Sequence, residues 1–240
     1  MVQWNKCQER RTRVQAKIYY EDNHLLIVEK PANMPVQADN SQDLDLLTFY
    51  KQFIKERDEK PGNVYLGLVH RLDRPVAGLI IFAKTSKAAS RLSDALRRRA
   101  IDRSYLAVVH GHPRKDSGQL TDYLWKDKKK NQSYVVSPQH KQAKKAQLNY
   151  QVLDQSRDFS LVRIQLQTGR SHQIRVQMQH LGHPLYGDQK YGAAVNQVGQ
   201  QIALWAYQVQ FIHPVKKEPL SIQALPPSNG IWTQFDLSKI

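Results

Sequence analysis

Apolar and polar positions along most of the chain alternate with the two-residue period of β-strands. Two short β-rich stretches, residues 17–20 and 25–29, flank a turn-forming Glu-Asp-Asn sequence, which predicts a β-hairpin. A continuous apolar run at residues 78–83 predicts a fully buried strand. The remaining expected strands are residues 105–109, 120–125, 146–153, 161–167, 202–212 and 220–224.

Three segments have apolar residues at helical spacing instead, and we expect α-helices at residues 44–56, 86–99 and 171–181. Asp43 or Asp45 suits the cap of the first helix, and Ser86 suits the cap of the second. Gly182 is a typical stop for the third.

Many strands with few helices between them predict an α/β (α+β) fold with a central mixed, mostly antiparallel sheet flanked by helices. A doubly wound sheet is not expected. The chain shows no repeat and no Ser/Gly linker, so we expect a single domain over residues 17–240. A basic lead at residues 1–16 precedes it.

The charge balance indicates which kind of partner the protein binds. Thirty-six Lys and Arg residues stand against 21 Asp and Glu, which gives a net charge of +15 at pH 7 and an isoelectric point near 9.9. Such an excess attracts polyanions and favours a nucleic-acid partner, although charge that only keeps a protein in solution gives the same balance.

The single cysteine, Cys7, excludes an intramolecular disulfide and fits a reducing compartment. The sequence contains neither the roughly 20 consecutive apolar residues that span a bilayer nor the apolar run of a secretory signal at its start. We therefore expect a cytoplasmic protein without a membrane partner.

An acidic residue between cations is the first candidate for chemistry. Asp73 follows His70, Arg71 and Leu72 and precedes Arg74, in an elbow between two apolar segments. Nearby cations hold a carboxylate ionised and available as a nucleophile or base. A salt bridge that only fixes a turn has the same local pattern, so this segment alone leaves both interpretations open.

A second polar cluster, residues 168–175, leads into the third predicted helix. Its Thr or Ser suits a helix cap, and its Gly allows a tight turn. Arg170 and Arg175 are five positions apart, so they bracket a site from the loop and the helix rather than share one helical face. An anion-binding helix start without special purpose is the alternative.

Two further features suit contact with nucleic acid. Tyr105 opens a strand beside basic residues, where its ring can stack on a base or fill the core. The lysines within residues 126–130, with Lys141, Lys144 and Lys145, predict an exposed basic hairpin that is either a phosphate contact or a solvated loop.

Taken in order, these segments resemble the RluA/RsuA-type pseudouridine synthase family over residues 17–225. The matching segments are residues 25–31, residues 70–74 with the apolar run after them, Tyr105, residues 168–175 and residues 182–188. The resemblance implies a single pseudouridine synthase catalytic domain with an RNA cleft across the sheet.

The resemblance also implies roles for the matching residues. Asp73 would be the catalytic aspartate at the floor of the cleft, and Arg175 would pair with it and keep it anionic. Tyr105 would stack on the target base and help to remove a proton, while Arg71 would enter the space that a flipped base leaves. We expect further RNA contacts from Lys30, His70, Arg74, Arg170, His172 and Gln173.

The implied reaction isomerises a uridine in a ribosomal or transfer RNA stem-loop to pseudouridine. The C1′–N1 bond breaks, the uracil rotates and C5 joins C1′, with Asp73 attacking C1′ or removing a proton from C2′; the sequence leaves both routes open. No cofactor is expected, because there is no redox change and no second substrate. No metal is expected, since His180 and His183 lack acidic or Cys partners. We expect a monomer.

Four positions depart from the family pattern and bear on substrate positioning. Asn33 replaces a usual Gly, Val76-Ala77 replaces Thr-Ser, Gln177 replaces a frequent His, and Trp205 replaces the His of Leu-His-Ala. An N-terminal S4-like RNA-binding domain, which some members carry, is not expected before the first strand.

Two other functions compete with this interpretation. The four departures would suit a catalytically silent RNA-binding protein on the same scaffold. A hydrolase that uses Asp73 would need an acid partner, which the motifs do not supply.

Overall fold

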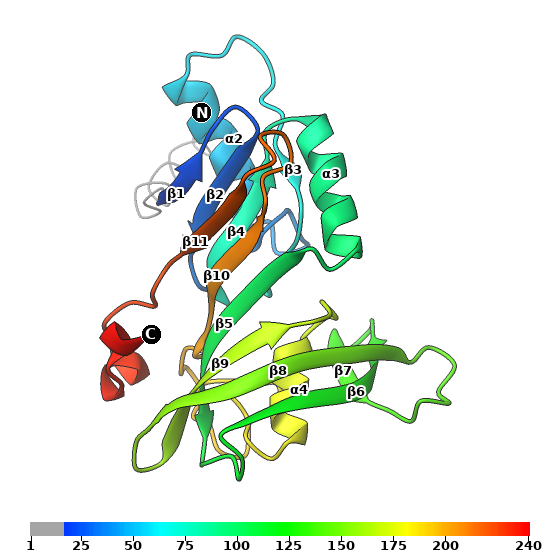
Figure 1. The fold of residues 1–240 in the computed structure, drawn as a ribbon, viewed down its shortest axis with the longest axis vertical. Helices are drawn as coiled ribbons and strands as arrows, with labels where there is room; N and C mark the ends of the chain where they lie inside the picture. The colour runs from blue at the N-terminus through cyan, green and yellow to red at the C-terminus, as the bar shows by residue number, and fades with distance from the viewer. Residues whose placement is uncertain (1–16) are drawn as a thin grey trace.

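A computed structural model of the chain describes residues 17–240, so the basic lead predicted at residues 1–16 lies outside the described residues. The described part forms one eleven-stranded sheet and three α-helices (Figure 1). The strands are β1 Ile18–Glu21, β2 Leu25–Lys30, β3 Gly67–Leu68, β4 Ala77–Ala83, β5 Ile101–His110, β6 Ser117–Asp127, β7 Gln132–Val135, β8 Lys144–Gln155, β9 Phe159–Leu166, β10 Leu204–Ile212 and β11 Pro219–Gln223. The helices are α2 Leu46–Arg57, α3 Ser86–Arg97 and α4 Gln173–His180, followed by 3-10 turns at Gly230–Gln234 and Leu237–Lys239.

The strands are ordered β1-β2-β4-β10-β5-β9-β8-β6-β7, with β3 beside β4 and β11 beside β10. Among the described strands, only β4 and β10 pair in parallel, through Trp205 opposite Ala77 and Ala206 opposite Gly78. The predicted mixed, mostly antiparallel sheet flanked by helices is therefore confirmed, and so is the predicted β1–β2 hairpin.

Strand β4 shows how the sequence pattern assigns faces. All seven of its residues are buried. Leu79 and Ile81 pack with α3 on one face of the sheet, whereas Ile80 and Phe82 pack with α2 on the other. A strand covered on both sides has to be apolar at every position, which is why residues 78–83 lack alternation.

Helix α2 begins at Leu46, two residues later than expected. Asp45, one of the two expected caps, is its N-cap, and its carboxylate accepts a hydrogen bond from the backbone N–H of Thr48. The expectation for α3 was wrong by one residue. Thr85, not Ser86, is the N-cap, and its hydroxyl accepts from the N–H of Ala88. Either hydroxyl is chemically suitable, and the extended backbone at Thr85 decides between them.

Helix α4 is shorter than predicted, and neither Thr nor Ser caps it. His172 is the N-cap residue, with a left-handed backbone (φ 54°) and no side-chain capping bond. The side chain of Gln173 bridges the loop instead: its Oε1 accepts from Thr168 Oγ1 and from the N–H of Arg170. The helix ends before Gly182, which has φ 92°.

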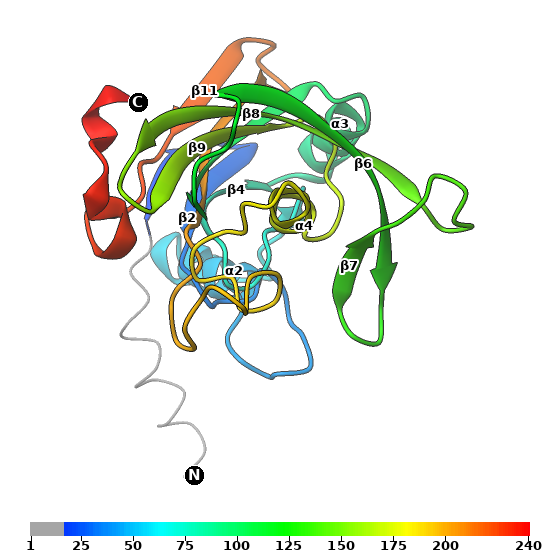
Figure 2. The same ribbon diagram turned by 90° about the horizontal axis from the view of Figure 1, so that it is seen from below.

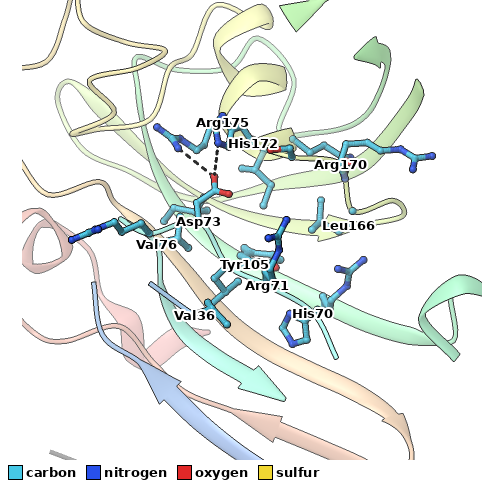
Figure 3. Close-up of a pocket in the computed structure, with 18 of the residues that line it drawn as sticks. Val36, His70, Arg71, Asp73, Val76, Tyr105, Leu166, Arg170, His172 and Arg175 are labelled. Atoms are coloured by element: carbon cyan, nitrogen blue, oxygen red, sulfur yellow. Dashed lines mark hydrogen bonds and ion pairs between the residues drawn. The ribbon is translucent and has the colours of Figure 1, made fainter. Parts of the chain in front are cut away.

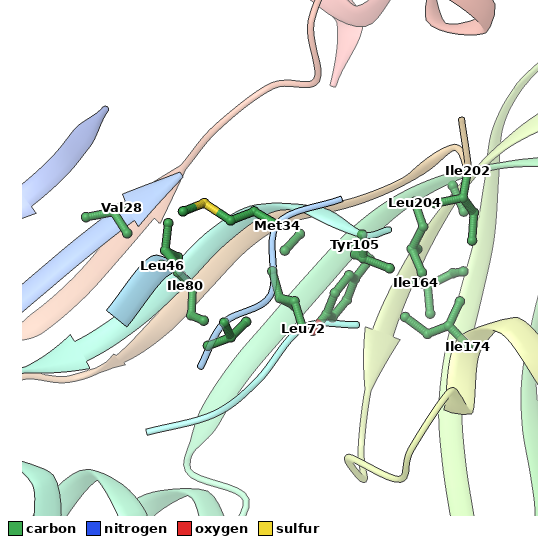
Figure 4. Packing of buried hydrophobic residues seen from close by; sticks show 14 of the residues in the cluster. Val28, Met34, Leu46, Leu72, Ile80, Tyr105, Ile164, Ile174, Ile202 and Leu204 are labelled. Atoms are coloured by element: carbon green, nitrogen blue, oxygen red, sulfur yellow. The ribbon is translucent and has the colours of Figure 1, made fainter. Parts of the chain in front are cut away.

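Helices α2 and α4 lie on the same side of the sheet (Figure 2). One hydrophobic core runs along this face and joins one half of the sheet, which contains β2 and β4, to the other half, which contains β8 and β9 (Figure 4). Leu72 and Tyr105 lie near its middle. Because Leu72 is anchored in this core, its neighbour Asp73 is held at a fixed place on the surface above it.

Within residues 17–240, no helix combines the length and the apolar character needed to cross a membrane.

The parallel contact between β4 and β10 depends on Gly78. This residue has φ 110°, and an added Cβ would lie 2.4 Å from the carbonyl oxygen of Ala206. We expect Gly78→Ala to lower the free energy of unfolding by about 2–4 kcal/mol, measured by urea denaturation. Gly62→Ala is the control, because an added Cβ there meets nothing within 4 Å. Equal stability of the two variants would contradict this account of the contact.

Candidate active site

A cleft of about 1120 Å³ opens on the face of the sheet that carries α2 and α4. The elbow before β4, the end of α3, the start of β5, the β9–α4 loop and the β6–β7 hairpin surround it. The cations that line it are Arg71, Arg74, Arg97, Arg99, Arg103, Lys126, Arg170, Arg175 and Lys190. Asp39 and Asp73 are the carboxylates among the lining residues, so the cleft is suited to a polyanion.

Asp73 and Arg175 meet in this cleft, as the family resemblance implied (Figure 3). Arg175 Nη1 donates to Asp73 Oδ2 at 3.2 Å. The side chain of Asp73 is 27% exposed and that of Arg175 only 7%, so the carboxylate faces the open cleft and the guanidinium lies behind it. His172 Nε2 lies 3.9 Å from the same Oδ2.

Arg175 has a second carboxylate partner that the sequence analysis missed. Its Nε and Nη2 atoms donate to Oδ2 and Oδ1 of Asp188, at 2.8 and 2.7 Å. The Asp188 side chain is fully buried. Burial opposes the positive charge of Arg175, but hydrogen bonds and charge from Asp188, with Asp73 adding to them, raise its pKa. The only sequence signal for Asp188 was its position at the end of residues 182–188, one of the segments that match the family.

Asp188 also organises the chain that follows it. Its Oδ1 accepts from the backbone N–H groups of Lys190 and Tyr191, at 3.0 and 3.2 Å. The ring of Tyr191 lies 5.2 Å from the Arg175 guanidinium, in cation–π geometry. A single buried carboxylate therefore fixes both the hydrogen-bonding edge of Arg175 and the aromatic ring beside it.

The elbow that presents Asp73 is held from below by Lys30. This side chain is fully buried, and its Nζ donates to the carbonyl oxygens of Pro31 and Arg74, at 2.8 and 2.9 Å. Burial lowers the pKa of Lys30 to about 7, although the negative charge of Asp73 acts to raise it. Lys30 does not line the cleft, so the structure supports a place beneath the elbow rather than the expected RNA contact.

His70 likewise secures the elbow. Its Nε2 accepts a hydrogen bond from the backbone N–H of Ile81 in β4, at 3.2 Å. Burial lowers the pKa of His70 to about 3, so the ring is neutral and able to accept. Although His70 borders the cleft, its accessible surface is only 8%.

Tyr105 comes from the middle of β5 and forms part of the cleft wall and of the core at once. It is 5% exposed. Burial raises the pKa of its hydroxyl, although the positive charge of Arg103 acts to lower it. The core interpretation of Tyr105 is therefore confirmed, whereas stacking on a base stays a prediction.

The exposed arginines differ in how they are held. Arg71 is exposed, and its side chain extends into the cleft (Figure 3). Arg74 is tied to the preceding loop through the carbonyl of Asn33 and the carboxylate of Asp43. Arg170 Nε donates to the carbonyl of Lys145 at 3.0 Å. Of these three arginines, Arg74 and Arg170 are held by hydrogen bonds, whereas Arg71 extends into the cleft beside Asp73.

None of the departures from the family pattern falls on Asp73, Tyr105 or Arg175. Asn33 has φ 62°, a left-handed conformation that Gly and Asn tolerate best. Val76 is buried, and Trp205 donates from Nε1 to the carbonyl of Ala224. Gln177 donates from Nε2 to Asp122 at 2.7 Å. Each substitution has a local structural partner or place in the core.

Within residues 17–240, no three His, Cys, Asp or Glu side chains are grouped so that they could hold a metal ion. His180 lies near Asp122, whereas His183 Nδ1 is hydrogen-bonded to the carbonyl of His110, so the two histidines do not converge.

Comparison with known sequences places this site in a family. A sequence model of the family described as RNA pseudouridylate synthase matches residues 24–180, which include Asp73, Tyr105 and Arg175. The uncharacterized RNA pseudouridine synthase YlyB of Bacillus subtilis is 37% identical over 215 residues, 88% of this chain and 69% of that protein. Ribosomal large subunit pseudouridine synthase C of Buchnera aphidicola is 32% identical, over 87% of this chain and 66% of that protein. Synthase D of Vibrio cholerae is 34% identical, over 89% of this chain and 68% of that protein.

The fold agrees with a solved structure described as human RNA pseudouridylate synthase domain containing 4. The TM-score is 0.74 at 23% identity, and the match covers 94% of this chain and 93% of that chain. The chain therefore belongs to the RluA/RsuA-type family of RNA pseudouridine synthases, which are isomerases that act on RNA.

Proposed function

We propose that Asp73 is the catalytic carboxylate that isomerises a uridine in structured RNA to pseudouridine. The observation that carries this proposal is the Asp73–Arg175 ion pair, in which a partly exposed carboxylate faces a cleft lined by cations. The guanidinium offsets the negative charge of Asp73 and orients its Oδ2, so the carboxylate can face RNA phosphates without losing its position.

The reaction breaks the C1′–N1 bond of the uridine and forms a C1′–C5 bond. The proton on C5 is lost to solvent and N1 takes up a proton, so the product is an isomer of the substrate. Asp73 would act on the ribose, either by attack on C1′ or by removal of the proton on C2′. Both routes need one ionised carboxylate held next to the sugar, which is what the pair with Arg175 provides. Neither route requires a redox partner or a second substrate.

The uridine has to leave the base stack, because C5 and the glycosidic bond are not both accessible inside a helix. Tyr105 lines the cleft wall, which supports a role in stacking on the flipped base. Arg71, which is exposed beside Asp73, is placed to fill the space that the base leaves. Arg170 and Arg74 border the same cleft and are suited to the phosphates on either side.

We further propose ribosomal RNA as the substrate, with transfer RNA as the competing substrate class. The support is the names of relatives, since several are ribosomal large subunit pseudouridine synthases. A cytoplasmic location and action as a monomer stay predictions.

A catalytically silent RNA-binding protein would be free to lose the geometry around Asp73. Here the ion pair, the tyrosine and the elbow that presents the carboxylate are all present together, which favours the active enzyme. The four departures also have local structural explanations that leave Asp73 untouched.

Asp73→Asn removes the charge and keeps the shape of the side chain, so we expect RNA binding with no pseudouridine formed. The measurement is release of tritium from RNA labelled at C5 of uridine, because that hydrogen leaves when C5 joins C1′. Asp158→Asn, on the exposed β8–β9 turn, is the matched control and should keep full activity. Full activity of Asp73→Asn would reject the assignment.

The role of Arg175 in turnover is tested better by Arg175→Lys than by Arg175→Met. Arg175→Met leaves the buried carboxylate of Asp188 without its charged partner, and we expect it to cost about 3–5 kcal/mol of stability. Arg175→Lys keeps the charge but cannot donate to both carboxylates in the same fork geometry. We expect it to fold, with turnover lowered at least about tenfold, or about 1.4 kcal/mol. Normal turnover of Arg175→Lys would argue against a role for the bidentate geometry.

The lysines of the β6–β7 turn should add phosphate contacts. If Lys128 and Lys129 each neutralise a phosphate, changing both to Gln should reduce the slope of log K against log salt by about 1.4–1.8. The control replaces Arg114 and Lys115, in the β5–β6 loop, by Gln and removes the same charge. Equal slopes for the two double variants would show that Lys128 and Lys129 make no phosphate contact and that the turn is a solvated loop.

A further inference from the structure

A chain of hydrogen bonds leads from the β6–β7 hairpin to the floor of the cleft. The backbone N–H of Ser133 in β7 donates to Tyr191 Oη at 2.7 Å. The same oxygen lies 2.7 Å from Nδ1 of His172. On the opposite side of that imidazole, Nε2 lies 3.9 Å from Oδ2 of Asp73. Two residues outside the proposed chemistry thus connect the hairpin with Asp73.

The direction of each hydrogen bond follows from the donors available. A backbone N–H can only donate, so Tyr191 Oη accepts from Ser133. Burial raises the pKa of Tyr191 to about 12, so its hydroxyl keeps its proton at neutral pH. Two side-chain groups interact with that hydroxyl: Ser133 Oγ, which gives its own proton to the carbonyl of Ser171, and His172 Nδ1 at 2.7 Å. An imidazole nitrogen accepts more strongly than a hydroxyl, so the Tyr191 proton goes to His172 Nδ1. A ring nitrogen that accepts carries no proton, so the proton of His172 is on Nε2, facing Asp73.

The surroundings keep His172 neutral. Burial lowers the pKa of His172 to about 4, although the negative charge of Asp73 acts to raise it. The positive charges of Arg175, Lys126 and Lys190 act in the same direction as burial. His172 is therefore an uncharged donor beside the carboxylate, whereas Arg175 is a charged one.

The same network holds the hairpin and the start of α4 together. Ser133 Oγ donates to the carbonyl of Ser171, the residue before His172, at 2.8 Å. Lys190 Nζ donates to the carbonyl of Asn131 in the hairpin turn, at 3.1 Å. A displacement of the hairpin would therefore move Tyr191 and His172 relative to Asp73.

We propose that Tyr191 is a positioning residue, which holds His172 as the neutral Nε2–H tautomer facing Asp73 and couples that orientation to the β6–β7 hairpin. The inference rests on the proposed role of Asp73. At 3.9 Å the Nε2 atom is too far from Oδ2 for a hydrogen bond, so His172 faces the carboxylate without bonding to it in this structure.

The tautomer is measured without any activity assay, by nitrogen–proton correlation NMR of the histidine rings in the full chain. His172→Asn identifies the signal, because Asn tolerates the left-handed backbone at this position. We expect Nδ1 unprotonated and Nε2 protonated at pH 7, and loss of this single form in Tyr191→Phe. A protonated Nδ1 in the unmodified protein, as the other tautomer or the cation, would overturn the inference.

Kinetics test whether Tyr191 acts through His172. Tyr191→Phe removes the hydroxyl and keeps the ring beside Arg175, so we expect single-turnover rates about three- to tenfold lower with unchanged RNA affinity. Tyr186→Phe makes the same change in the same loop, on a ring that stacks with His110, and should not change the rate. In the His172→Asn background, Tyr191→Phe should have no further effect.

Additive effects of the two substitutions, or an effect on RNA affinity alone, would contradict the positioning role. Failure of the proposed function has a different signature. If Asp73→Asn were fully active, the kinetic coupling would lose its meaning, but the NMR result would still report whether Tyr191 sets the His172 tautomer.

Discussion

The site depends on Arg175, because its guanidinium joins two carboxylates from distant parts of the chain. Asp73 lies 102 positions before it and Asp188 lies 13 positions after it. Asp188 occupies Nε and Nη2, which leaves Nη1 for the carboxylate in the cleft. A buried cation and a buried carboxylate each cost several kcal/mol without a partner, so Arg175 and Asp188 stabilise each other inside the protein. The arrangement lets Asp73 remain partly exposed and still have a fixed charged neighbour.

The fold brings these groups together from three directions. Leu72 anchors the elbow in the core that spans both halves of the sheet, and Lys30 holds the same elbow through two backbone carbonyls. Helix α4 presents Arg175 from the other half, and the chain after it returns with Asp188. The contacts of Lys30 with Arg74 and of Arg175 with Asp73 join segments far apart in sequence, so the position of the Asp73 carboxylate depends on the folded sheet and not on local sequence. The cations on the rim of the cleft then offset the repulsion between Asp73 and an RNA backbone.

The sequence predicted most elements correctly because their burial is regular: β4 is apolar throughout, and α2 has an apolar face and an acidic cap. The helix starts were less certain, since Thr85 and Ser86 are equally good caps and only the backbone conformation separates them. The pairing of Asp73 with Arg175 came from the resemblance, not from spacing. Asp188 and Tyr191 could not be found in this way, because their importance comes from contacts that the pattern does not encode. Lys30 was expected to bind RNA for its charge, but its place in β2 buries it.

We propose that this chain forms pseudouridine in ribosomal RNA. Pseudouridines can be mapped at single-nucleotide resolution in total RNA from cells with and without the gene. We expect the deletion strain to lose at least one pseudouridine in its large ribosomal RNA, and this pseudouridine to return when the purified protein is added to the extracted RNA. Identical maps in the two strains, together with no new pseudouridine on addition of the protein, would contradict it.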